Sequence, residues 1–69
     1  MIMDELIQKL KEERKHEADK LNNLEAFLAG EGIKKLTEYH QSLLKRQKYT
    51  MRDFVEVLDL RIRDLEESL

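Results

Sequence analysis

Basic and aromatic side chains that could bind an anion gather in one stretch of the chain, SLLKRQKYTMRDF, and just before it. Lysine and arginine donate charge-assisted hydrogen bonds to phosphate, and aromatic rings stack on bases or contact cations. The candidate ligand-binding residues are Tyr39, His40, Lys45, Arg46, Lys48, Tyr49 and Arg52. They predict a site for a small anionic ligand such as a nucleotide. The alternative is that these cations only balance Glu25 and Glu31 across a pair of helices.

The distribution of charge separates small anions from nucleic acids as partners. Residues 33–52 contain six Lys or Arg and one Glu, a net charge of +5, in a chain whose formal net charge is −2. The remainder therefore carries −7. Proteins that bind nucleic acid usually have net basic character and a groove-reading motif. A mostly acidic surface would repel a phosphate backbone, so nucleic acid is disfavoured and a compact anion is favoured.

No pattern in the sequence is typical of catalysis or of a metal site. There is no cysteine, and His16 and His40 lack the spacing of a zinc site. Glu38 precedes His40 by two residues, so the chain has no Glu-x-x-His pair of the kind found in di-metal bundles. The two glycines lack the Gly-Lys-Ser that follows in a phosphate loop. We therefore expect a protein that is not an enzyme and has no cofactor or metal.

The residues are arranged for two long helices. Charged and hydrophobic residues each make up 41% of the chain, proline is absent, and the only glycines are Gly30 and Gly32. Apolar residues recur at helical spacing before and after this glycine segment. The two series are Ile7, Leu10, Leu21, Leu24 and Leu28, then Leu44, Met51, Val55, Leu58, Ile62, Leu65 and Leu69. Thr37 is a suitable N-cap for the second helix.

The pattern predicts an all-α fold in a single domain, residues 1–69, with two long helices in an antiparallel hairpin. We expect the first helix over about residues 4–29, a bend over 30–37 with a short turn of helix, and the second helix over about 38–67. A short chain without disulfides buries little apolar surface by itself. The apolar stripe of the second helix is also wider than one partner helix covers.

Self-association into a helical-bundle oligomer, a dimer or larger, would cover the excess. The expected interface consists of Met51, Phe54, Val55, Leu58, Ile62 and Leu65. Two charges, Arg14 and Glu17, interrupt the stripe of the first helix. Either both lean to solvent while Ala18 faces inward, or they form an interchain ion pair, with Arg61 as a possible partner, that fixes the register.

No apolar run approaches the roughly 20 residues that span a bilayer, and the N-terminus is charged too early for a signal peptide. The sequence therefore predicts a soluble, cytoplasmic protein without a membrane partner.

Residues 24–62 carry a resemblance to a group of very short bacteriophage proteins of the crAss-phage-related type. Their pattern is Leu-x-x-Phe at the end of the first helix, a short turn, a Leu-Leu-x-x-Gln step, then Met, an aromatic residue and a closing Arg-Ile. The matching residues here are Leu24, Phe27, Leu43, Leu44, Gln47, Met51, Phe54, Leu58, Arg61 and Ile62. This chain departs from the group at Glu17, where a leucine is expected.

The resemblance implies a phage accessory protein that acts in the host cytoplasm against host defence, by binding and not by chemistry. Most of the group has no assigned function. A sponge would hold a cyclic nucleotide or related immune signal in pockets between subunits, and the basic band with its tyrosines favours this mechanism. An inhibitor would lay a helical face on a host defence protein, which the acidic ends favour. A purely structural oligomerisation module needs only the packing stripes. We favour the sponge.

Overall fold

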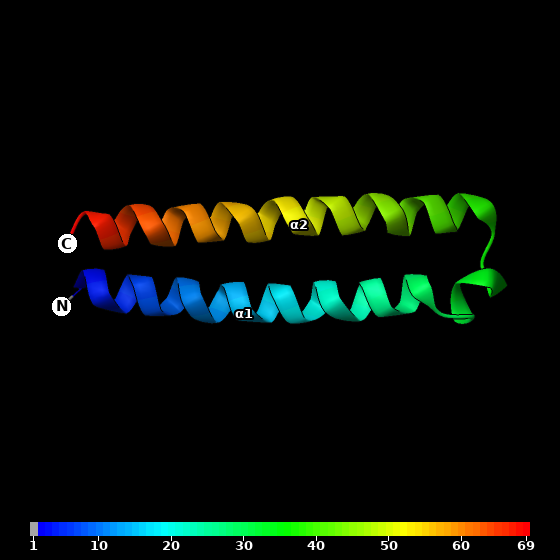
Figure 1. The fold of residues 1–69 in the computed structure, drawn as a ribbon, viewed down its shortest axis with the longest axis horizontal. Helices are drawn as coiled ribbons and strands as arrows, with labels where there is room; N and C mark the ends of the chain where they lie inside the picture. The colour runs from blue at the N-terminus through cyan, green and yellow to red at the C-terminus, as the bar shows by residue number, and fades with distance from the viewer. Residues whose placement is uncertain (1) are drawn as a thin grey trace.

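The protein folds as one long helical hairpin in the computed structural model, which describes residues 2–69 (Figure 1). Helix α1 spans Ile2–Ala29, the short 3-10 helix η1 spans Gly32–Lys35, and helix α2 spans Glu38–Glu67. The hairpin measures 49 × 14 × 14 Å, with the two ends of the chain at one end and the bend at the other (Figure 1). The predicted all-α hairpin is confirmed. Helix α1 begins two residues earlier than predicted.

Both helices begin with residues that suit a helix N-terminus. Asp4 and Glu5 lie in the first turn of α1, and Glu38 lies in the first turn of α2, where negative charge is favourable. The Thr37 hydroxyl accepts a hydrogen bond of 3.1 Å from the backbone N–H of His40. Thr37 is thus the N-cap of α2, as the sequence predicted.

The bend depends on close packing at a glycine. Neither Gly30 nor Gly32 has a positive φ, so left-handed backbone does not explain them. A Cβ at Gly32 would lie 3.0 Å from Cε1 of Phe27, whose ring packs against the bend. The side chain of Ile33 is buried, and Gln41 Nε2 donates a hydrogen bond of 3.0 Å to the Leu36 carbonyl. The bend is therefore held to both helices.

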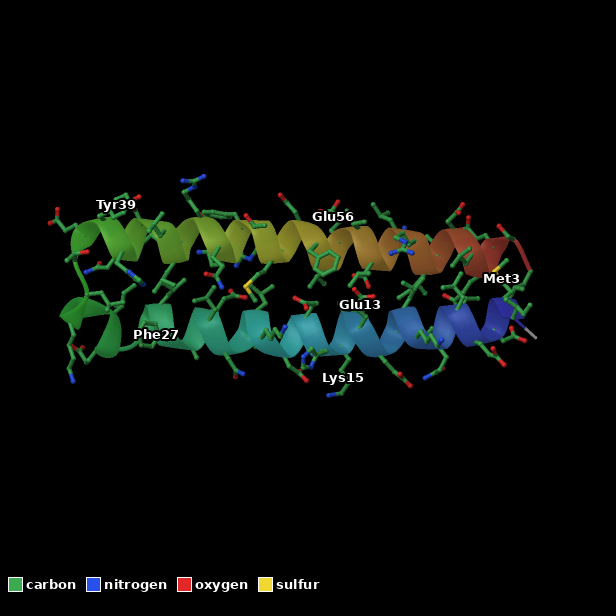
Figure 2. All side chains as sticks on the ribbon, turned by 180° about the vertical axis from the view of Figure 1, so that it is seen from behind. Met3, Glu13, Lys15, Phe27, Tyr39 and Glu56 are labelled. Carbon is green, nitrogen blue, oxygen red and sulfur yellow. The ribbon has the colours of Figure 1, made fainter. Side chains whose placement is uncertain are left out.

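A narrow apolar seam between the helices forms the core. Figure 2 shows Met3 at the open end of the hairpin. Met3 and Leu65 pack there against a buried cluster that consists of Ile7, Leu10, Leu58 and Ile62. Leu21, Val55 and Ile33 are buried farther along the molecule toward the bend. Leu58 is completely buried, and burial of a leucine side chain contributes about 1.5–3 kcal/mol to folding.

The residues that the sequence assigned to an oligomer interface differ in how deeply the structure buries them. Val55, Leu58 and Ile62 are buried, and Met51 and Leu65 are half-buried. The seam of a single chain therefore covers more of the α2 stripe than we expected. Phe54 stays 38% exposed, since it lies to one side of this seam.

Neither helix, within residues 2–69, contains a stretch long and apolar enough to cross a membrane.

Candidate anion-binding site

The hairpin has two edges with different chemistry. A helical turn holds 3.6 residues, so positions three and four after a buried residue lie on opposite sides of it. Leu24 and Glu25 flank the buried Leu21 in this way. On α2, Arg52 and Asp59 stand three before and four after the buried Val55, on the side that faces Glu25. The edge with these charged residues is called the charged edge below, and the opposite one the apolar edge.

Among residues 2–69, the ion pairs that cross the charged edge between α1 and α2 are three. Lys11 Nζ lies 3.2 Å from Glu66 Oε2, Arg14 Nε lies 2.9 Å from Asp59 Oδ1, and Arg52 Nη2 lies 2.9 Å from Glu25 Oε2. All six side chains are between about a third and a half exposed. Solvent screens such pairs, and each contributes about 0.2–1 kcal/mol. The regular spacing of these pairs along α2 is more useful for locating the site than the energy that each pair contributes.

The α2 members of these pairs follow a step of seven residues. Glu66, Asp59 and Arg52 are seven apart and therefore lie on one stripe of α2. One further step toward the bend places Lys45 on the same stripe. No ion pair involves Lys45 within the described residues 2–69. The series of cross-helix pairs thus reaches a cation that has no carboxylate opposite it.

An open depression of about 300 Å³ lies at this position, beside the bend. It is lined by Glu25, Leu28 and Ala29 of α1 and by Lys45 and Lys48 of α2. Leu28 and Ala29 supply apolar surface, and Glu25 already binds Arg52. The two ammonium groups are the donors that remain. Lys48 Nζ lies 4.8 Å from the centre of the Tyr49 ring, the only side-chain partner found for it among residues 2–69.

Lys45 and Lys48 are three residues apart on α2 and line the same depression. Residues three apart are neighbours on a helix surface, and like charges at this spacing destabilise the helix slightly. An anion between Lys45 and Lys48 would remove that repulsion and gain charge-assisted hydrogen bonds from both ammonium groups. The apolar floor would exclude water from one side of the ligand.

The structure brings together only part of the predicted ligand-binding set. Lys45 and Lys48 line the depression, and Arg52 borders it through its ion pair with Glu25. Tyr49 contacts Lys48 and stands next to the depression.

The other three predicted residues lie away from it. Tyr39 is exposed on the side of α2 that faces away from α1 (Figure 2). His40 is exposed in the first turn of α2, where its backbone N–H donates a hydrogen bond to the hydroxyl of the N-cap Thr37. Arg46 follows Lys45 by one position, which turns its side chain by about 100° away from the charged edge.

Sequence reasoning missed the α1 half of the depression. Leu28 was assigned to the core, and Ala29 to the end of the helix. The signal that could have found them is the pairing register. Once Arg52 is paired with Glu25, the position that faces Lys45 carries no acid.

The charges in the middle of α1 have partners that the sequence did not indicate. Arg14 forms its ion pair with Asp59 of the same chain, and its side chain is 42% exposed. The Glu17 side chain is 18% exposed and lies 3.4 Å from Lys20 Nζ. Of the two predicted charge-balance partners, Glu25 pairs across the hairpin with Arg52, whereas Glu31 pairs with Lys34, three residues away.

The fold and the depression define a small helical hairpin with a basic ligand-sized hollow beside its bend. A profile of the Sequestin family matches residues 4–64, and the chain therefore belongs to the Sequestin family. The family name denotes sequestration, which fits a binding protein. The comparisons with curated proteins and with solved structures give no match.

Proposed function

We propose that this chain is a phage accessory protein that acts against host defence by sequestering a small anionic immune signal of the cyclic-nucleotide class. The name of the Sequestin family supports sequestration, and the resemblance of residues 24–62 to small phage proteins supports the biological setting. One observation carries the choice of ligand. Lys45 and Lys48 form no ion pair among the described residues 2–69. Both line a depression whose floor is the apolar surface of Leu28 and Ala29.

The size and the donors of the depression suit the phosphate end of such a ligand. Its volume of about 300 Å³ is at the lower end of the range of about 300–1,000 Å³ for ligand pockets. A phosphate group and part of its sugar fit between the lysines. The rest of the ligand extends along α2 toward Tyr49, whose ring is 58% exposed and offers a stacking surface for a base.

Sequestration requires affinity but no reaction. Each charge-assisted contact to the phosphate contributes about 1.5–3 kcal/mol, which is roughly a ten- to hundredfold change in affinity. The sequence placed the pocket between subunits, whereas the depression is formed by the two helices of one chain. In the proposed oligomer, each chain therefore carries its own phosphate contacts.

Calorimetric titration of the purified protein with a panel of cyclic mono- and dinucleotides tests this proposal. We expect at least one of them to bind. Lys45→Ala and Lys48→Ala should each weaken binding by roughly ten- to a hundredfold. The matched control is Arg46→Ala, which removes a neighbouring cation of α2 outside the depression and should leave affinity within about twofold. Binding that depends on Arg46 and not on the lysines would contradict the proposed site.

A second experiment separates sequestration from inhibition of a host protein. If no nucleotide in the panel binds, and a pull-down from host lysate recovers one defence protein, the sequestration proposal is wrong. The function would then be that of an inhibitor that covers a host protein with one helical face.

A further inference from the structure

The apolar edge, opposite the ion pairs, exposes large apolar side chains from both helices. Leu6 is 40% exposed, Phe27 42% and Phe54 38%, and Leu24 and Leu43 are half-buried. Figure 2 shows Phe27 near the bend end of α1. These five residues are apolar side chains that the hairpin leaves partly uncovered, and they are called the apolar strip below.

Helical spacing places these residues on one edge. Leu6 and Leu24 are 18 residues apart, which is about five turns, so they share a stripe of α1. Leu43 and Phe54 are 11 residues apart, about three turns, and share a stripe of α2. On α1, Leu24 and Glu25 lie on opposite sides of the buried Leu21. On α2, Phe54 and Arg52 lie on opposite sides of the apolar seam. Leu24, Leu43 and Phe54 therefore lie in the half of this edge nearer the bend, whereas Leu6 stands apart near the open end, with Glu13 between it and Leu24 on α1.

The total surface of the chain indicates what covers this edge. A compact monomer of 8.3 kDa is expected to expose about 4,600 Å². The hairpin exposes 5450 Å². The excess, about 850 Å², is close to the roughly 800 Å² that each partner buries in a standard protein interface. The elongated hairpin, 49 × 14 × 14 Å, therefore has enough surface beyond that of a compact monomer to form one standard interface with a second copy.

Charges at the apolar edge indicate how the two copies are oriented. Arg61 stands seven residues after Phe54 on the same stripe of α2, and its side chain has no ion pair or hydrogen bond within residues 2–69. On α1, Glu13 lies seven residues after Leu6, at the same edge. Because Arg14 pairs with Asp59, Glu13 and Arg61 stand at nearly the same distance from the bend.

We propose that the apolar edge binds a second copy of this chain, with the two hairpins parallel and their bends at the same end. A twofold axis along the length of the hairpins would set α1 of each copy against α2 of the other. Arg61 of each chain would then face Glu13 of the other, twice per dimer, while the apolar residues pack between them. The depressions at Lys45 and Lys48 stay on the outer edges, one per chain.

Sedimentation or light scattering of the full chain tests the surface. The wild type should show twice the 8.3 kDa of a single chain, and Phe54→Glu should show the monomer mass with helical content retained. The control is Leu60→Glu, because Leu60 is 51% exposed on the outer side of α2, away from both edges. We expect it to remain dimeric. A monomeric wild type, or a dimer lost in Leu60→Glu and kept in Phe54→Glu, would overturn the proposal.

A mixing experiment tests the orientation and does not depend on a substitution in packed surface. Arg61→Glu alone and Glu13→Lys alone should each weaken the dimer by roughly tenfold or more, since each brings like charges together. An equimolar mixture should form a heterodimer, in which the two substituted side chains, of opposite charge, face each other at one contact and the native pair is kept at the other. Failure of the mixture to associate would contradict the parallel arrangement.

The outcomes are distinct from those for the proposed ligand. A monomeric Phe54→Glu variant should still bind the nucleotide, because the depression belongs to one chain. A protein that binds no nucleotide should still form the dimer.

Discussion

The guanidinium group of Arg14 binds the carboxylate of Asp59 through two hydrogen bonds, Nε to Oδ1 at 2.9 Å and Nη2 to Oδ2 at 3.3 Å. The two residues are 45 positions apart in the chain, so the pair shows which turns of α1 and α2 lie opposite each other. Both side chains are more than 40% exposed. The pair therefore has the geometry of a strong interaction in an environment that screens it.

A double-mutant cycle on this pair should give a small but measurable coupling. We expect Arg14→Ala and Asp59→Ala to lower the free energy of unfolding with a coupling of about 0.2–1 kcal/mol in urea denaturation. The matched pair is Lys15 and Asp19, at a spacing of four on α1 with Lys15 79% exposed, whose coupling should be about 0.3–0.5 kcal/mol. A coupling above about 2 kcal/mol for Arg14 and Asp59 would show that screening is weaker than we argue.

The apolar seam should carry most of the stability of the hairpin. Leu58→Ala removes a completely buried side chain, and we expect the free energy of unfolding to fall by about 2–5 kcal/mol. Leu60→Ala, two positions along α2 at an exposed site, should change it by less than about 0.5 kcal/mol. Thermal and urea melts followed by circular dichroism would measure both. Equal effects of the two substitutions would place the core elsewhere.

The two glycines of the bend should respond to alanine in opposite ways. At Gly30 a Cβ would meet nothing closer than the Ala26 carbonyl at 3.5 Å, so Gly30→Ala should stabilise the fold by about 0.4–1 kcal/mol. At Gly32 the Cβ would press on the Phe27 ring at 3.0 Å, and this strain should offset the gain in stability or exceed it. Phe27→Leu combined with Gly32→Ala should remove the strain. A Gly32→Ala variant as stable as Gly30→Ala would show that the ring yields freely.

Glu25 should limit the affinity of the depression for anions. Glu25→Gln removes the one negative charge in the lining and also frees Arg52 from its ion pair. Both effects favour an anion, and a surface charge at this range is worth on the order of 1 kcal/mol, or roughly fivefold in affinity. Titration of wild type and variant at low and high salt would measure the gain, which salt should reduce. Weaker binding by Glu25→Gln would mean that the carboxylate itself contacts the ligand.

The sequence predicted the fold well because helical periodicity, a glycine pair and the Thr37 cap all indicate the same hairpin. It predicted part of the lining of the depression. Lys45 and Lys48 were found as cations on one helix, but Tyr39 and Arg46 were grouped with them only because they are close in sequence, and the helix turns them away. Ala29 and Leu28 carry no chemical signal of their own. Their role depends on which residues of α1 and α2 lie opposite each other, and the sequence pattern alone does not specify that register.

Sequestration is tested most directly by the fate of the bound molecule. The protein is incubated with a nucleotide that it binds in titration, the free nucleotide is measured in the filtrate of a membrane that retains the protein, and the complex is then heated. We expect the concentration of free nucleotide to fall in proportion to the wild-type protein added, and to stay unchanged when a Lys45→Ala, Lys48→Ala double variant is added. Heating the wild-type complex should release the nucleotide chemically unchanged. A filtrate that keeps its full nucleotide concentration, or that returns an altered product after heating, would contradict the proposed function.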